Sequence, residues 1–356
     1  MNFTLAQMQT WLPMAVPVAG TLKADQLTSV CIQAVRTDSR SVVAGDLFVA
    51  LKGENFDGAA FLLQAQAQGA AAVLFEAAHV QSPDTQKHLE GVHIPAFCVP
   101  NARVALGELS AQWRRQFEVS LIGVTGSNGK TTVTQMIAAV LRADASQPSM
   151  STQGNLNNEI GVPLTLFNLR ASHRRAVIEL GMNHPGEIEV LARYAQPTIG
   201  LVNNAQREHL EFMATVEAVA RENGAVISAL PATGVAVFPA DDDYTPLWRA
   251  LAGARRVITF ALAGPADVTG SADWTGRNWQ VQAQTPSGPL NFALSVAGRH
   301  NVNNALAAAA CTLAAGVPLA DQLLLGAAMC LIAAWLARVL HKAELAHVGE
   351  TEHTFE

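Results

Sequence analysis

Short apolar runs alternate with turn residues over the first third of the chain. The runs DLFVAL (Asp46–Leu51) and AAVLF (Ala71–Phe75) have the length and the aliphatic and aromatic content of buried strands. The stretch between them, residues 58–70, has the composition of a helix and reaches a helix-ending glycine at Gly69. Residues 1–112 are therefore predicted to form a small N-terminal α/β domain.

Longer strand and helix patterns follow from about residue 113. The run VSLIGVTG predicts a buried strand, and Lys130–Ala143 predicts a helix with one apolar side. Further strands are predicted at 174–181 and 198–204, and further helices at 185–195 and 215–230. Such alternation is typical of a mainly parallel sheet covered by helices on both faces. The fold class expected for the chain is therefore α/β.

The last part of this region changes pattern. Residues 279–298 predict a hairpin that turns at 286–288. Residues 300–316 predict an alanine-rich helix that stops at Gly316. We expect the central domain to span 113–317.

Composition narrows the possible functions. The chain has 356 residues, half of them apolar and 15% charged, which is typical of a folded protein with two or three domains. The net charge is −6 and no long basic run occurs, so a nucleic-acid-binding surface is not expected. The expectation is a protein that acts as a monomer on small molecules.

Cysteine usage and the terminal segments indicate a cytoplasmic protein. The four cysteines are scattered without a CxxC pair, which favours neither a zinc site nor a disulfide framework. The N-terminus has no signal-peptide pattern. The uncharged run Leu323–Ala337 has fifteen residues, fewer than the ~20 that span a bilayer. We expect a buried or misplaced helix there rather than a membrane anchor.

The stretch GVTGSNGKTTV has the ingredients of a loop that binds phosphates. Gly126 and Gly129 would let backbone N–H groups face an anion, and the following helix start would favour negative charge. Lys130 would reach the outer phosphates, and the Thr131 hydroxyl would bind Mg²⁺. The common spacing would place another glycine where Val124 stands, so the alternative is an ordinary turn between strand and helix.

Other polar residues have both functional and structural interpretations. Glu179 ends a predicted strand at the sheet edge where open α/β proteins bind ligands, and its carboxylate suits Mg²⁺. By itself such a residue is as often a helix cap. His209 follows another strand end, and the asparagines between Gly154 and Gly161 alone would favour a turn. Asn301 alone would be read as a helix N-cap.

Several motifs together resemble the Mur ligases, a family of ATP-dependent enzymes that build the peptide of a bacterial cell-wall precursor. TGSNGKTT resembles the family's phosphate loop. STQGNLNNEIGVPLTL resembles the substrate loop of the member that adds the terminal dipeptide, and TDSRSVVAGDLFVALKGENFDGAAF resembles the UDP-binding domain. GRHNVNNALAAAA and the run from Val177 to Met213 continue the match, which covers about Val35 to Leu319. The central domain is thus expected to be of the P-loop ATPase type.

The resemblance implies a ligase that uses ATP and Mg²⁺ to join D-alanyl-D-alanine to UDP-N-acetylmuramoyl-tripeptide through an acyl phosphate. It implies catalytic roles for Lys130, Glu179 and His209, and metal binding by Thr131, Glu179 and His209. The implied ATP-binding residues are Thr125, Gly126, Ser127, Asn128, Gly129, Lys130, Thr131, Thr132, Asn301 and Asn304. The implied substrate-binding residues are Ser39, Arg40, Asn155, Asn157 and Asn158.

The chain departs from the family pattern at one helix. Many members carry a carbamoylated lysine after the loop that holds His209, where it helps to bind a second Mg²⁺. Asn223 stands at that position, and no lysine occurs in this helix. Asparagine cannot be carbamoylated, so we expect the second metal site to be built differently or to be weaker.

A second departure follows Leu319, where the resemblance stops. The family pattern would continue into a Rossmann-like domain, and we expect residues 318–356 to be a divergent apolar tail in its place. The alternative hypothesis is therefore an inactive fragment that binds only a nucleotide or the UDP precursor. Another Mur ligase or a folylpolyglutamate-type enzyme is a weaker choice, because GNLNNEIGVP argues against it.

Overall fold

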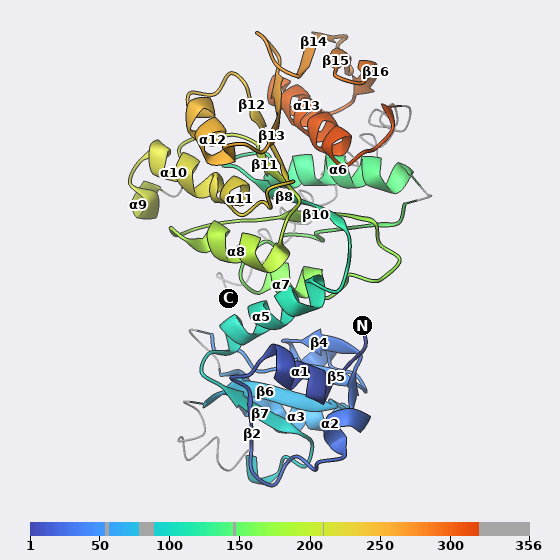
Figure 1. The fold of residues 1–356 in the computed structure, drawn as a ribbon, viewed down its shortest axis with the longest axis vertical. Coiled ribbons are helices and arrows are strands. Elements are labelled where there is room, and N and C mark those ends of the chain that lie inside the picture. The colour runs from blue at the N-terminus through green and yellow to red at the C-terminus, as the bar shows by residue number, and fades with distance from the viewer. Residues whose placement is uncertain (54–56, 78–88, 145–146, 209, 320–356) are drawn as a thin grey trace, which may run out of the picture. The chain divides into compact units, whose positions relative to one another are not determined.

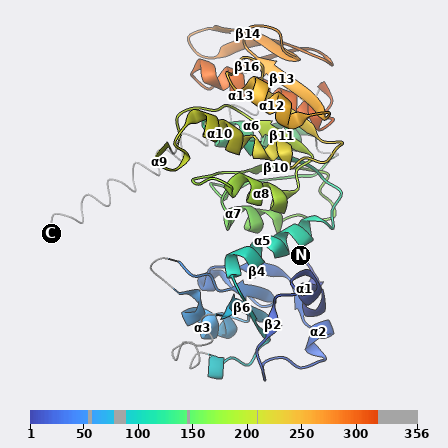
Figure 2. The same ribbon diagram turned by 60° about the vertical axis from the view of Figure 1, so that its left-hand side comes forward.

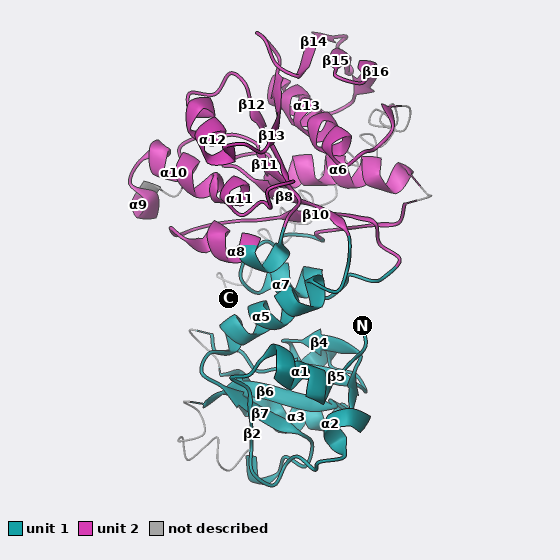
Figure 3. Ribbon diagram, viewed as in Figure 1, with its two compact units in different colours: residues 1–118, 153–171, 193–196 teal, residues 119–152, 172–192, 197–356 magenta. Residues whose placement is uncertain are grey.

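The computed structural model describes residues 1–53, 57–77, 89–144, 147–208 and 210–319. The chain contains two compact units (Figure 3). Unit 1 comprises residues 1–118, 153–171 and 193–196, and unit 2 comprises the described part of 119–152, 172–192 and 197–356. Residues 153–171, which the sequence pattern places in the central domain, pack within unit 1. The predicted domain limits stay a prediction.

Unit 1 is built on a five-stranded sheet in which four neighbouring strands are parallel. The strand order is β2 (Val16–Pro17), β7 (Ala96–Val99), β6 (Ala72–Glu76), β5 (Asp46–Val49) and β4 (Ala34–Arg36), with β2 antiparallel to β7. A separate two-stranded sheet pairs β1 (Phe3–Thr4) with β3 (Cys31–Ile32). The strands predicted at 46–51 and 71–75 are confirmed, because all of β5 and nearly all of β6 are buried.

Short helices connect and cover these strands (Figures 1 and 2). The helices and 3₁₀ turns of unit 1 are α1 (Leu5–Trp11), α2 (Gln26–Ser29), η1 (Ser39–Ser41), η2 (Gly58–Phe61), α3 (Leu62–Ala67), α5 (Ala102–Arg114) and α7 (Gly161–Leu166). The predicted helix at 58–70 thus starts as a 3₁₀ turn and continues as α3. Gly69 follows its end with a φ of 97°, a left-handed conformation that glycine adopts readily.

Unit 2 contains a nine-stranded, mainly parallel sheet, as the strand–helix alternation predicts. The strands in sheet order are β16 (Gly288–Leu294), β15 (Trp279–Thr285), β14 (Val268–Trp274), β13 (Arg256–Ala261), β12 (Val235–Pro239), β11 (Ile199–Val202), β8 (Ser120–Thr125), β10 (Arg175–Glu179) and β9 (Ser149–Ser151). All pairs from β9 to β14 are parallel, and β14–β16 form an antiparallel end. The predicted hairpin is confirmed, with Thr285 opposite Gly288.

Helices cover the large sheet on both faces (Figure 1). The described helices of unit 2 are α6 (Lys130–Ala143), α8 (Glu187–Ala195, whose last three residues group with unit 1), α9 (Leu210–Met213), α10 (Val216–Asn223), α11 (Ala225–Ser228), α12 (Thr245–Ala252) and α13 (Arg299–Ala314). Helices α6 and α13 pack together against the sheet and share one hydrophobic core. The buried alanines of α13 allow this close approach because their side chains are short.

The structure corrects one predicted helix. The pattern predicts a single helix over 215–230, but the chain breaks at Gly224 into α10 and α11. A Cβ atom at Gly224 would lie 2.6 Å from Leu251 and 3.1 Å from Trp248, so the backbone passes close to α12 there. Among the described residues no helix is long and apolar enough to cross a membrane. The run Leu323–Ala337 lies outside the described residues.

Candidate functional site

The predicted phosphate loop lies between β8 and α6, in the strand–loop–helix context that phosphate binding requires. Gly126 and Gly129 have φ values of 134° and 77°. A Cβ atom at Gly126 would lie 3.0 Å from the Cβ of Asn203, and one at Gly129 would lie 2.8 Å from Oδ1 of Asn304. Both positions therefore need glycine for backbone conformation and for space.

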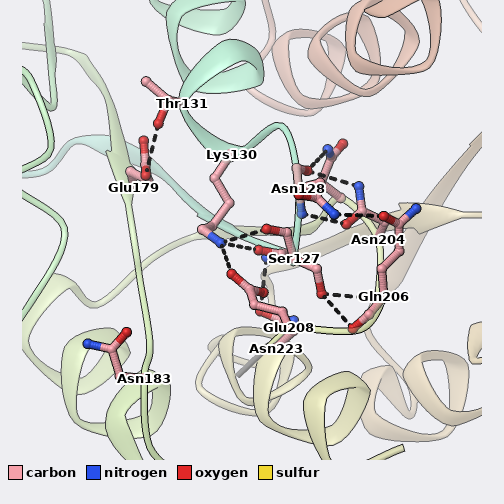
Figure 4. Close-up of polar contacts among 12 residues, drawn as sticks. Ser127, Asn128, Lys130, Thr131, Glu179, Asn183, Asn204, Gln206, Glu208 and Asn223 are labelled. Carbon is pink, nitrogen blue, oxygen red and sulfur yellow. Dashed lines mark hydrogen bonds and ion pairs between the residues drawn. The ribbon is translucent and has the colours of Figure 1, made fainter. Parts of the chain in front are cut away.

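The first backbone N–H groups of the loop are bonded to the surrounding protein (Figure 4). The N–H of Gly126 donates to Oδ1 of Asn223 at 2.9 Å, and that of Ser127 donates to the carbonyl of Asn204 at 3.2 Å. The N–H of Asn128 donates to Oδ1 of Asn204 at 2.9 Å. Anion binding then falls to the first-turn N–H groups of α6, which no carbonyl within the helix can reach.

Lys130, the first residue of α6, lies over this loop. Its Nζ donates to the carbonyls of Gly126 at 2.5 Å and Ser127 at 3.0 Å, and to Oε1 of Glu208 at 3.0 Å. These three acceptors use all three ammonium protons. The Lys130 and Glu208 side chains are only 15% and 17% exposed, so water screens this ion pair weakly. No sequence pattern indicated Glu208, because the residues around it carry no sign of the cation that it faces.

The side chain of Thr131, the second residue of α6, lies next to that of Glu179. The Thr131 hydroxyl donates to Oε1 of Glu179 at 3.2 Å (Figure 4). Glu179 ends β10, is 2% exposed, and its backbone N–H donates to the hydroxyl of Thr152 at 3.0 Å. A hydroxyl and a carboxylate are hard oxygen donors of the kind Mg²⁺ prefers.

The protein supplies few side-chain ligands of its own for a metal. Among the described residues no group of three or more His, Cys, Asp and Glu side chains could hold an ion. Mg²⁺ usually keeps several waters and takes phosphate oxygens, so two protein oxygens from Thr131 and Glu179 fit it. His209 lies outside the described residues, so its metal and catalytic roles stay predictions.

Two predicted ATP-binding residues form side-chain hydrogen bonds with the surrounding protein. The Thr125 hydroxyl is fully buried and contacts the carbonyls of Asn223 at 2.9 Å and Leu201 at 3.0 Å. The Ser127 hydroxyl donates to the carbonyl of Gln206 at 3.3 Å and accepts from its N–H at 2.9 Å. These contacts hold the loop to β11 and to the segment that follows it.

A chain of amide side chains joins α13 to the loop. Nδ2 of Asn203 donates to the carbonyl of Asn128 and to Oδ1 of Asn304, each at 2.9 Å. Nδ2 of Asn304 donates to Oδ1 of Asn301 at 3.1 Å, and Nδ2 of Asn301 donates to the carbonyl of Ala297 at 2.7 Å. Asn301 and Asn304 are 6% and 5% exposed. The predicted pair is thus joined to the loop, with Asn304 next to Gly129 and Asn301 bonded to Asn304.

A polar pocket of about 710 Å³ opens beside the loop. Its lining residues are Asn128, Gly129, Thr132, Asn203, Asn204, Gln206, Asp241, Asp242, His300, Asn301, Asn303 and Asn304. No sequence pattern indicated Asp241 and Asp242. The Asp242 carboxylate accepts from the backbone N–H of Tyr244 at 2.9 Å, and burial raises its pKa. Carboxylates repel phosphates and accept from hydroxyl or amino groups, so this side of the pocket suits a nucleoside.

The residues predicted to bind substrate lie in unit 1, and two of them have local partners. The Ser39 hydroxyl is buried and donates to Oε1 of Gln64 at 3.0 Å. Arg40 pairs with Asp38 two residues before it, with Nη2 2.7 Å from Oδ2, and its side chain is 83% exposed. The hydrogen bond from Arg40 lowers the pKa of the Asp38 carboxyl to about 2.

The predicted substrate loop forms a turn before α7. Oδ1 of Asn158 accepts from the N–H groups of Ile160 at 3.2 Å and Gly161 at 2.9 Å, the pattern of an Asx turn. The N–H of Asn157 donates to the carbonyl of Asn155 at 2.8 Å. This turn brings Asn155, Asn157 and Asn158 together, with Asn155 and Asn158 exposed.

A cation that no sequence pattern indicated, Arg103, lies beside this turn. Nη1 of Arg103, on α5, is 2.8 Å from Oε1 of Glu159, and Nη2 donates to the carbonyl of Lys52 at 2.9 Å. Arg103 therefore ties the turn to the strand–loop region of the same unit.

Comparison with known protein families finds two matches. Residues 124–312 match the Mur ligase middle domain, and residues 31–114 match the domain described as Mur ligase family, catalytic domain. The first match contains the phosphate loop, Glu179 and the amide chain, and the second contains Ser39 and Arg40.

Individual proteins are similar over most of the described residues. UDP-N-acetylmuramoyl-tripeptide–D-alanyl-D-alanine ligase of Escherichia coli K12 is 39% identical over 296 residues, which are 83% of this chain and 63% of that protein. A crystal structure of MurF from Acinetobacter baumannii has 33% identity and a TM-score of 0.81, over 92% of this chain and 68% of that one. MurF of Thermotoga maritima in complex with ADP has 26% identity and a TM-score of 0.68, over 81% and 65%. The chain spans about three-fifths of the length of the curated relatives it matches.

Proposed function

Because this chain belongs to the Mur ligase family, we propose that it is an ATP-dependent ligase that joins D-alanyl-D-alanine to UDP-N-acetylmuramoyl-tripeptide. The observation that carries the proposal is the loop in which Lys130 begins α6 and the Thr131 hydroxyl reaches the buried Glu179. The product would be a precursor of peptidoglycan, which links the protein to cell-wall growth, cell shape and cell division. We propose that it works in the cytoplasm as a monomer, without nucleic acid.

The nucleotide would bind with its phosphates at the start of α6. The first-turn N–H groups and the helix dipole favour the phosphate oxygens, and the Lys130 ammonium balances their charge. To reach a phosphate, Lys130 exchanges its contact with Glu208 for one with a phosphate oxygen. The nucleoside would then extend into the pocket lined by Asn301, Asn304 and Asp242.

Thr131 and Glu179 would hold Mg²⁺. When bound, the ion neutralises negative charge on the phosphate oxygens. Burial of Glu179 at the end of β10 holds its carboxylate in place without substrate, so little reorganisation is needed. His209 is the proposed ligand of a second ion.

The chemistry proceeds in two displacements. The terminal carboxylate of the tripeptide attacks the γ-phosphorus of ATP, and the bond to ADP breaks to leave an acyl phosphate. The amine of D-alanyl-D-alanine then attacks the acyl carbon, loses a proton, and releases phosphate as the amide forms. Lys130 contributes charge stabilisation to the first step. Ser39, Arg40, Asn155, Asn157 and Asn158 are the proposed contacts of the UDP-linked substrate.

A ligation assay on the full chain tests this function. The purified protein is incubated with ATP, Mg²⁺, UDP-N-acetylmuramoyl-tripeptide and D-alanyl-D-alanine, while ADP release and the mass of the amide product are followed. We expect ADP release that depends on both UDP-N-acetylmuramoyl-tripeptide and D-alanyl-D-alanine and that falls steeply in Lys130→Ala. If the chain binds the UDP precursor but forms neither ADP nor product, the ligase proposal fails and a binding-only fragment takes its place.

A further inference from the structure

Asn223 is the last residue of α10, yet its contacts are with the phosphate loop. Its side chain is 1% exposed, and Oδ1 accepts from the N–H of Gly126 at 2.9 Å. Its backbone carbonyl accepts from the hydroxyl of Thr125 at 2.9 Å. The two contacts join the carboxyl end of α10 to the last residue of β8 and to the first residue of the loop.

Only the acceptor half of the Asn223 amide is used. Nδ2 has no hydrogen-bond partner among the described residues. The N–H of Gly126 can only donate, so this contact decides which end of the amide faces the loop. A lysine ammonium has no acceptor and could not take this role. Position 223 therefore requires a side chain whose acceptor atom lies as far from the backbone as Oδ1 of asparagine does.

Gly126 couples this contact to the lysine of the site. Its N–H is held by Asn223, and its carbonyl accepts from Nζ of Lys130 at 2.5 Å. A shift of Gly126 would therefore also move the Lys130 ammonium. The space beside Gly126 is also small, because a Cβ atom added there would lie 3.0 Å from the Cβ of Asn203.

We infer that Asn223 is a positioning residue for phosphate binding. It holds Gly126 so that Lys130 and the first turn of α6 face the nucleotide phosphates together. It makes no contact with the nucleotide itself and acts through the loop. This inference rests on the proposed binding of ATP at the loop.

The test compares ATP with adenosine, which has no phosphates. Asn223→Leu removes the acceptor at similar volume, and Asn223→Asp keeps an acceptor of the same length. Thr259→Val is the matched control, because Thr259 is a buried residue of β13 that bonds Asp267 and not the loop. Affinities are measured by calorimetry in about 5 mM Mg²⁺, a concentration intended to saturate the nucleotide. The thermal midpoint of each variant is also recorded.

We expect Asn223→Leu to weaken ATP binding about tenfold or more and to change adenosine binding less than about twofold. Asn223→Asp keeps the acceptor but adds a negative charge that repels phosphate, so its ATP affinity should fall by about three- to tenfold, less than in Asn223→Leu. Wild-type ATP affinity in Asn223→Leu would overturn the inference. Equal losses of affinity for ATP and adenosine would also overturn it, if Thr259→Val shows the same losses at the same thermal midpoint. If Asn223→Leu does not fold, Asn223→Ala removes the same acceptor and takes its place, and wild-type ATP affinity in that variant contradicts the inference. A wild-type chain that binds neither ligand would instead refute the nucleotide site.

Discussion

The phosphate loop of unit 2 and the predicted substrate residues Arg40 and Asn158 of unit 1 are all polar, but they are held in opposite ways. In the loop, Gly126, Asn128 and Lys130 bond residues that lie 76 to 97 positions away in the sequence. In unit 1, Arg40 bonds a residue two positions away and Asn158 a residue three positions away. A site held by distant segments is a property of the whole fold, whereas a local turn forms wherever its few residues occur.

The comparison predicts its largest effect at Lys130. Lys130→Ala removes the cation of the loop and leaves the Glu208 carboxylate without that partner. We expect ADP formation to fall by about three orders of magnitude, because charge stabilisation of phosphoryl transfer is lost. The measurement is a coupled assay of ADP release, with the exposed Lys23→Ala as control. Activity within about tenfold of the wild type would show that Lys130 is not the phosphate-binding cation.

A second prediction concerns the close approach of Asn304 to Gly129 in the loop. In Gly129→Ala the residue keeps a φ of 77°, and its new Cβ lies 2.8 Å from Oδ1 of Asn304. We expect the unfolding free energy to fall by about 1–3 kcal/mol and much of the ATP affinity to be lost. Gly276 has a similar φ of 91° but no atom within 4 Å of an added Cβ. Denaturant unfolding of Gly276→Ala should therefore show only the conformational cost, about 1 kcal/mol. Equal losses in the two variants would contradict the role given to Asn304.

A third prediction separates Lys130 from its acidic partner. Glu208→Gln removes the charge that competes with phosphate for the ammonium, so ATP should bind about three- to tenfold more tightly in Mg²⁺-free buffer. Calorimetry measures the affinity. Glu217→Gln is the control, since it removes a carboxylate from an exposed pair with Arg221. Weaker ATP binding in Glu208→Gln would mean that Glu208 supports the nucleotide rather than competing with it.

A smaller effect is expected at the turn of unit 1. Asn158→Ala removes the acceptor for two backbone N–H groups before α7 and should lower the unfolding free energy by about 1 kcal/mol. Asn158→Asp keeps the acceptor and should keep the stability. If Asn158 also contacts the UDP precursor, the Asp variant binds that precursor several-fold more weakly, since its charge repels the diphosphate. Unchanged precursor binding would leave Asn158 with its local role alone.

The smallest effect concerns the exposed pair of Arg40 and Asp38. The folded pKa of Asp38 lies at about 2, below its ordinary value of 3.8. A depressed carboxyl pKa contributes stability above the unfolded pKa, and this contribution disappears as the pH falls from about 3.8 towards 2. Because water screens this exposed pair, Arg40→Ala should lower the thermal midpoint at pH 7 only slightly, and it should return the Asp38 pKa towards 3.8. NMR titration of the carboxyl carbon measures this pKa, and an unchanged value in Arg40→Ala would show that Arg40 is not its cause.

Features that depend on neighbouring residues could be read from the sequence. The buried strands β5 and β6, the start of α6 at Lys130 and the turn between β15 and β16 follow from apolar runs and turn residues a few positions apart. The break at Gly224 could not be read this way. It depends on α12 passing close to the backbone, and that neighbour lies more than twenty residues further along the chain.

The same distinction divides the candidate site. The loop's glycines, Lys130 and Thr131 could be chosen from one short stretch, because strand, loop and helix start are consecutive. Glu208 and Asp242 escaped prediction, since an acidic residue after a strand carries no local sign of the cation or pocket it will face. The proposed role of Asn223 depends on where α10 ends in space, whereas the sequence indicated only that lysine was absent there.

By itself the sequence determined the family, the α/β class and the residues of the phosphate loop, because these reside in contiguous patterns of apolar, glycine and hydroxyl residues. Only the tertiary structure decided how that loop is held. The parallel strands β8, β10 and β11 lie far apart in the sequence but end at one edge of the sheet. Glu179 and Asn203 reach the loop there, together with the end of α10. Contacts of that kind form across the sheet, so no window of neighbouring residues contains them.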